Sequence, residues 1–106
     1  RVLFRSALAR CVAQQPKIIL ADEPVASLDP VTSNQVMNDF VKINKALNIT
    51  VIANMHHVDI ALKFANRVIG IKEGLIVFDG PSNKVNNQIL KEIYGRELSD
   101  DELMEH

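Results

Sequence analysis

The sequence predicts an α/β fold built around a parallel sheet, and three features carry this prediction. The apolar run of residues 18–21 has no polar face, which is typical of a strand buried on both sides in a parallel sheet, and residues 49–53, rich in β-branched side chains, indicate a second buried strand. A long segment with helical periodicity, residues 31–47, separates them, so the order is strand, helix, strand. Polar side chains follow both runs, at the position where open α/β sheets bind their ligands.

The chain is expected to begin its regular structure with a helix over residues 7–14. Pro16 ends this helix, because proline removes a backbone donor and cannot continue the hydrogen-bond ladder. The first strand follows over residues 17–21.

The long helix has a clear start and a clear end. Asp29 can cap its first amides and Pro30 suits its first turn, so the helix is expected over residues 31–47. Asn48 can end it in a left-handed turn. The expected apolar stripe consists of Val36, Phe40, Val41, Ile43, Ala46 and Leu47.

The second half of the chain is expected to contain a strand, a helix and a hairpin. Residues 49–53 are rich in β-branched side chains and form the second strand, and residues 58–65 form a short helix. Residues 68–71 and 75–78 flank a short turn that contains a glycine, which is typical of a β-hairpin. A last amphipathic helix over residues 86–94 follows.

Size and charge exclude several functions. The chain has 106 residues, with 12 basic and 13 acidic side chains, so no basic excess indicates nucleic-acid binding. No stretch approaches the roughly 20 apolar residues of a membrane span, so direct membrane insertion is not expected. Cys11 is the single cysteine, which excludes an internal disulfide and a thiolate metal site.

Two adjacent acids, Asp22 and Glu23, follow the first apolar run. Neighbouring positions on a strand point to opposite sides, so the two carboxylates can have different tasks beside a phosphate ligand and its magnesium ion. This layout indicates nucleotide hydrolysis. The alternative for the pair alone is a solvated turn that begins a helix.

Taken together, the residues resemble the second half of the ATPase subunit of ATP-binding-cassette (ABC) transporters. Residues 18–23 look like its Walker B strand, Ser27-Leu28-Asp29 like its D-loop, and His56 like its switch histidine. Residues 7–10 resemble the helix that follows its signature motif. The resemblance implies a P-loop NTPase (RecA-like) core with a parallel sheet, truncated, and with a C-terminal β-hairpin and helices.

The resemblance also implies roles for individual residues and the cofactors ATP and Mg²⁺. Asp22 would hold the magnesium ion, and Glu23 would orient or deprotonate the attacking water. His56 would bond to the γ-phosphate, so Asp22, Glu23 and His56 together would contact the bound nucleotide. His57 is expected to face solvent or a neighbouring subunit, and Asp29 to be a helix cap, a dimer contact or both.

Further segments point to one subgroup, the ATP-binding subunits of phosphonate importers. Residues 24–29, 57–61, 67–70 and 77–81 are similar to that subgroup. The resemblance implies a homodimer with Ser27, Leu28 and Asp29 at the contact, and transmembrane permease subunits as further partners. It places the subunit peripherally on the cytoplasmic face of the cell membrane.

The resemblance also has gaps. A Gly-rich phosphate loop (Walker A) and the signature motif do not occur in the sequence. Residues 1–96 are therefore assigned to the C-terminal half of a nucleotide-binding domain, with residues 97–106 as an acidic tail. The chain is expected to be a carboxy-terminal fragment that does not hydrolyse ATP by itself.

Three other functions remain open from the sequence. One is a soluble ABC ATPase without a transport role. Another is a receiver-like signalling domain, although the second strand ends in Asn54 and His56 and not in a phosphate-accepting Asp. The third is a non-catalytic interaction fragment that uses residues 79–106.

Overall fold

The computed structural model describes residues 6–95, with side chains from residue 8 onward. The chain forms two compact units that divide between Met55 and His56, and each unit has its own two-stranded sheet. The opening segment, residues 1–5, and the predicted acidic tail, residues 97–106, lie outside the described residues.

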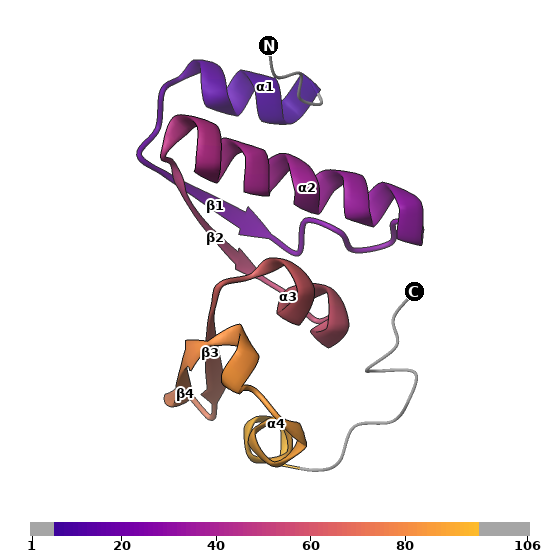
Figure 1. Cartoon of the computed structure of the whole chain (residues 1–106), viewed down its shortest axis with the longest axis vertical. Coiled ribbons are helices and arrows are strands. Elements are labelled where there is room, and N and C mark those ends of the chain that lie inside the picture. Colours follow the sequence, from indigo (N-terminus) through magenta and orange to yellow (C-terminus); the bar gives the residue numbers. More distant parts are fainter. Residues whose placement is uncertain (1–5, 96–106) are drawn as a thin grey trace. The chain divides into compact units, whose positions relative to one another are not determined.

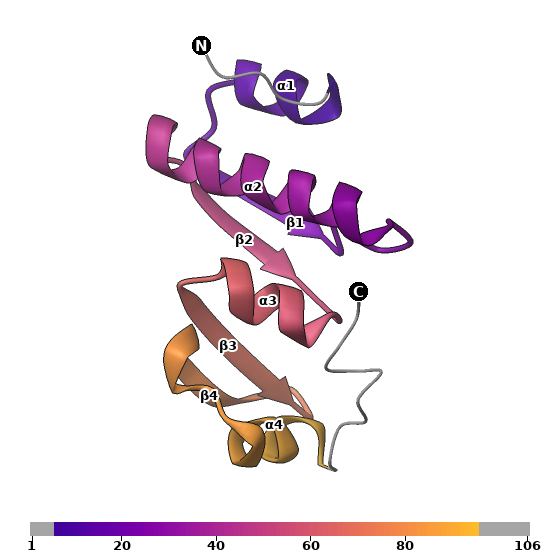
Figure 2. The ribbon, with the colours of Figure 1, turned by 45° about the vertical axis from the view of Figure 1, so that its right-hand side comes forward.

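The first unit contains the predicted strand–helix–strand order. Its elements are α1 (Ser6–Ala13), β1 (Ile18–Asp22), α2 (Pro30–Leu47) and β2 (Thr50–Asn54). The strands pair in parallel, with Ile18 opposite Thr50 and Asp22 opposite Asn54, which confirms the predicted parallel sheet. Figures 1 and 2 both place α2 between α1 and the two strands.

Helix α2 begins at Pro30, one residue before the predicted start, and ends at Leu47 as predicted. The backbone N–H of Thr32 donates to Oδ1 of Asp29 at 2.6 Å, and Asn48 adopts a left-handed conformation with φ of 55°. The predicted stripe is right at Phe40 and Ile43 but wrong at its end, because Leu47 is 47% exposed. The buried residues of the helix are Ser33, Met37, Phe40 and Ile43.

The prediction that both strands are buried on two sides is wrong. Ile19 is 6% exposed, whereas Leu20 is 77% exposed and Ile52 is 54% exposed. Helix α2 supplies a layer for one face of the sheet, and within residues 6–55 no second helical layer covers the other. We call that other side the open face; it consists of Ile18, Leu20, Asp22, Thr50, Ile52 and Asn54.

The second unit contains the predicted hairpin between two helices. Its elements are α3 (Val58–Phe64), β3 (Arg67–Lys72), β4 (Leu75–Pro81), the single-turn 3₁₀ helix η1 (Ser82–Lys84) and α4 (Asn87–Tyr94). The strands are antiparallel and Lys72 pairs with Leu75. Glu73 and Gly74, which join them, have positive φ angles of 51° and 78°, as a type I′ hairpin turn requires.

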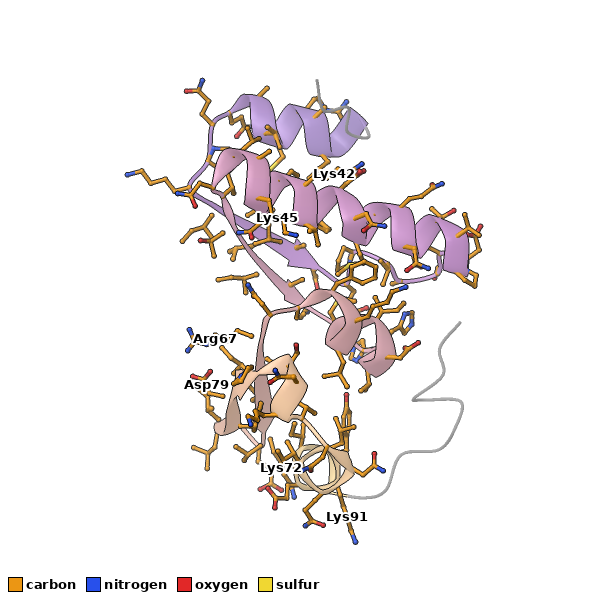
Figure 3. All side chains as sticks on the ribbon, in the orientation of Figure 1. Lys42, Lys45, Arg67, Lys72, Asp79 and Lys91 are labelled. Carbon is orange, nitrogen blue, oxygen red and sulfur yellow. The ribbon has the colours of Figure 1, made fainter. Side chains whose placement is uncertain are left out.

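Strand β4 continues to Pro81, three residues beyond the predicted end. Opposite charges on the paired strands support the extension, because Nε and Nη2 of Arg67 donate to the two carboxylate oxygens of Asp79 at 2.8 and 2.7 Å. Figure 3 shows the two side chains pointing toward each other. The hydrogen bonds from Arg67 hold the pKa of Asp79 below its usual range.

Helix α4 packs closely on this hairpin. Asn86 caps it by accepting a hydrogen bond from the backbone N–H of Ile89 at 2.9 Å, and Leu90 is 7% exposed. A Cβ at Gly70 would lie 2.6 Å from Cγ1 of Ile93, so glycine is needed where the helix meets β3. Among residues 6–95, no helix is both long and apolar enough to span a bilayer.

Candidate active site

The carboxyl ends of β1 and β2 bring three polar residues together. Asp22 and Asn54 are paired as the last residues of the two strands. The side-chain nitrogen Nδ2 of Asn54 donates to Oδ1 of Asp22 at 2.8 Å, and Oδ1 of Asn54 accepts from the backbone N–H of Glu23 at 2.6 Å. One carboxamide therefore joins both acids that follow the predicted strand.

The local chain path explains this contact. Side chains alternate along β1, so Asp22 lies on the open face beside Asn54. The strand ends at Asp22, and Glu23 turns the chain with a positive φ of 45°. The turn, and not strand alternation, therefore sets the direction of the half-buried Glu23 side chain. Such a left-handed conformation costs a non-glycine residue about 1–2 kcal/mol.

The predicted dimer-contact loop, Ser27-Leu28-Asp29, follows this turn. The backbone N–H of Ala26 donates to the carbonyl of Glu23 at 3.1 Å, and that of Leu28 donates to the carbonyl of Val25 at 3.2 Å. Ser27 is exposed with a second positive φ, of 63°, while Leu28 is half-buried. The loop is thus a pair of turns that leaves Ser27 accessible to another molecule.

Asp29 has its carboxylate engaged within the chain. The backbone N–H of Thr32 and then the Thr32 side chain donate to it, and these hydrogen bonds hold the pKa of Asp29 below its usual value. The helix-cap role predicted for Asp29 is confirmed by this geometry. Its role in a dimer contact stays a prediction.

Protonation of Asp29 is expected to destabilise the fold. The pKa of Asp29 is lower in the folded chain than in the unfolded chain, so the ionised carboxylate stabilises the fold. This contribution to the free energy of unfolding is complete above the unfolded pKa of about 3.9, and it is lost as the pH falls through the folded pKa. Asp29→Asn retains a capping oxygen but cannot titrate, so its stability should fall less than that of the wild type between about pH 5 and pH 2. Urea unfolding of the 106-residue chain at several pH values measures this.

Asn38→Ala, at an exposed position of the same helix that has no titratable group, is the control and should follow the wild-type pH dependence. Asp29→Ala should be less stable than Asp29→Asn at every pH, because alanine has no capping oxygen. An equal pH dependence for Asp29→Asn and the wild type would show that the cap does not titrate with folding.

The two predicted histidines lie in the second unit. His56 is exposed and precedes α3, and its predicted approach to Glu23 and the nucleotide stays a prediction. His57 is the N-cap residue of α3, although its side chain makes no capping hydrogen bond. Its Nδ1 is buried and lacks a hydrogen-bond partner within the described part of the chain, while the residue as a whole is half-buried. The expectation that His57 faces solvent or a neighbouring subunit stays a prediction.

The open face fits the predicted magnesium site at Asp22. Asp22 is exposed, and only its Oδ1 is hydrogen-bonded among the described residues, so Oδ2 can bind a cation directly or through water. Magnesium keeps several waters and takes one or two carboxylates together with substrate phosphates. No cluster of three or more metal-binding side chains occurs in residues 8–95.

Asn54 is the residue that sequence reasoning did not assign to the site. The signal for it was present, because a polar residue at the last position of a parallel strand lies beside the last residue of its neighbour. What the sequence did not reveal is that one amide group bonds to both Asp22 and Glu23.

Comparison with known proteins decides the family. The chain is 62% identical over 92 residues, 87% of its length, to the "Phosphonates import ATP-binding protein PhnC" of Mesoplasma florum. It is 54% identical over 98 residues, 92% of its length, to the protein of the same name from Staphylococcus haemolyticus. The chain belongs to the ATP-binding cassettes of ABC transporters.

Solved structures agree with this ATP-binding cassette assignment. Clostridium perfringens cbiO1, described as part of the ABC transporter complex cbiONQ, matches 84% of the chain and 32% of its own length, with a TM-score of 0.68 and 31% identity. A putative metal-chelate type ABC transporter matches 83% of the chain and 36% of its own length, with a TM-score of 0.75 and 22% identity, which shows the fold alone. No protein-family model matches the chain.

These matches confirm the predicted fold class and remove one alternative. The cassette has the predicted P-loop NTPase architecture, with a parallel sheet and a separate antiparallel hairpin. A receiver-like signalling domain is excluded, because the relatives are ATP-binding proteins. The chain spans 37% of the length of the Mesoplasma florum relative and 38% of the Staphylococcus haemolyticus relative.

Proposed function

We propose that this chain is part of the ATP-hydrolysing subunit of an ABC importer for phosphonates. The observation that carries the proposal is the joined pair of acids at the carboxyl end of a parallel strand, Asp22 and Glu23. The 62% identity to a phosphonate import ATP-binding protein supports the choice of substrate class.

In this proposal each site residue has a separate task. Glu23 accepts a proton from the water that attacks the γ-phosphate, or orients that water, and Asp22 holds magnesium through Oδ2 or a bound water. Magnesium, when bound, neutralises charge on the phosphate oxygens. His56 donates a hydrogen bond to the γ-phosphate, a role that neutral imidazole can fill from one ring nitrogen.

The partners follow from the same proposal. Ser27, Leu28 and Asp29 contact a second copy of the subunit, and the exposure of Ser27 and Asp29 supports this. The dimer transmits closure around ATP to transmembrane permease subunits, at the cytoplasmic face of the membrane. Residues 1–96 belong to the nucleotide-binding domain in this proposal, and residues 97–106 form a tail.

The 106 residues by themselves are proposed to bind Mg-ATP weakly and not to hydrolyse it. Phosphate-binding backbone amides and a loop lysine normally supply much of the contact to the β- and γ-phosphates. The sequence contains no Gly-rich loop of that kind. Calorimetric titration with Mg-ATP is therefore expected to give no micromolar binding.

The proposal is tested in a chimera. The matching segment of the Mesoplasma florum relative is replaced by residues of this chain, since the two are 62% identical over 92 residues. The chimera should hydrolyse ATP in a magnesium-dependent manner, and phosphonate should stimulate hydrolysis when permease and binding-protein partners are present. Hydrolysis that never responds to those partners would favour a soluble ABC ATPase, and an inactive chimera would contradict the proposal.

A further inference from the structure

The bridge between β1 and β2 gives Asn54 a place in the site. We propose that Asn54 is a positioning residue for hydrolysis: its carboxamide holds the backbone of Glu23 and the carboxylate of Asp22 in their working arrangement. This inference rests on the proposed function. It assigns a task to a residue that lies two positions before His56 and contacts both acids.

The first contact acts on the backbone of Glu23. Its φ of 45° lies in the left-handed region, which an isolated glutamate rarely occupies. The backbone N–H of Glu23 donates to Oδ1 of Asn54 at 2.6 Å. A residue of the neighbouring strand β2 therefore stabilises this backbone conformation of Glu23. Without that acceptor the Glu23 backbone can relax toward extended angles, and the direction of its side chain changes with it.

The second contact acts on the carboxylate of Asp22. Nδ2 of Asn54 donates to Oδ1 at 2.8 Å, which restricts rotation of the carboxyl group and leaves Oδ2 for a cation. Asp22 and Asn54 are paired in register, so the ladder of β1 and β2 holds the two side chains next to each other.

The two contacts require a carboxamide. One planar group must donate to a carboxylate and accept from an amide, and asparagine offers both on a short side chain. Aspartate at this position could accept from Glu23 but would repel Asp22. Alanine could do neither. These two substitutions therefore separate the two arms of the bridge.

Amide hydrogen exchange at Glu23, measured on the chimera without nucleotide or magnesium, tests the bridge independently of ATP hydrolysis. In Asn54→Ala the Glu23 amide should exchange about five- to tenfold faster than in the wild type, because it loses its acceptor. In Asn54→Asp the protection should remain. Equal Glu23 exchange in Asn54→Ala and the wild type would overturn the proposal.

Steady-state kinetics test the consequence for turnover. Asn54→Ala should lower kcat about 10- to 100-fold, as expected for displaced catalytic groups, and leave KM for ATP within about twofold. Asn54→Asp should also lower kcat although it protects the Glu23 amide, because Asp22 is turned away. A rise in KM with kcat unchanged would instead assign Asn54 to nucleotide binding and overturn the positioning role.

A control variant and the wild-type chimera distinguish a failure of the Asn54 role from a failure of the proposed function. Asn38→Ala, at an exposed asparagine of α2, should leave both exchange at Glu23 and kcat unchanged. A wild-type chimera without ATPase activity would contradict the proposed function, while the exchange measurement would still decide whether Asn54 holds Glu23. An active wild type with a fully active Asn54→Ala would contradict only the role of Asn54.

Discussion

Glu23→Gln in the chimera is expected to stop turnover and leave ATP binding intact. Glutamine has nearly the shape of glutamate but cannot accept a proton from the attacking water, and a positioned base contributes about 10²–10⁴-fold to such a step. The backbone contact from Glu23 to Asn54 does not involve the side chain, so the bridge should persist. Phosphate release measures kcat, and calorimetry with Mg-ATP measures binding.

The expected product of this substitution is an ATP-bound dimer that does not reopen. Size-exclusion chromatography with ATP should therefore show more dimer for Glu23→Gln than for the wild type. Glu92→Gln, at an exposed position of α4, is the control and should behave as the wild type. Undiminished hydrolysis in Glu23→Gln would remove the proposed base.

His56→Ala is expected to lower kcat strongly, whereas His57→Ala should leave kcat nearly unchanged. A donor aimed at the transferring phosphoryl group is worth about 10²–10³-fold when it is removed. His56 is exposed just before α3, whereas the Nδ1 atom of His57 is buried. Single-turnover hydrolysis of bound ATP measures the difference and separates chemistry from product release.

The neighbouring histidine makes this a matched comparison, because both substitutions remove one imidazole from adjacent positions. Thermal unfolding of both variants checks whether His57→Ala acts through stability, since a half-buried side chain contributes to packing. If His57→Ala lost activity and His56→Ala retained it, the two assignments would have to be exchanged.

Local signals predicted the elements well. Asp29 and Asn48 mark the ends of α2 because a carboxylate can cap amide groups and asparagine tolerates left-handed angles. The hairpin was predicted from a glycine between two β-rich runs, and Glu73 and Gly74 both have the required positive φ. These features depend on a few consecutive residues, so the sequence contains the relevant chemistry.

Burial was predicted less well. Apolar residues at both parities of β1 indicated two buried faces, yet Leu20 is 77% exposed and Ile18 is 54% exposed. Burial depends on which other layer covers a strand, and a single run of residues does not contain that information. For the same reason the predicted apolar stripe of α2 included Leu47, which is exposed, and omitted Met37, which is buried.

By itself the sequence determined the type and order of the elements, the family resemblance and the two acids that follow β1. Tertiary structure decided which strand face lies open, and it decided that Asn54 joins Asp22 to Glu23. The physical reason is range: caps, turns and periodicity act within a few residues, whereas this bridge spans 31 and 32 positions of sequence and exists only because β1 and β2 pair in parallel.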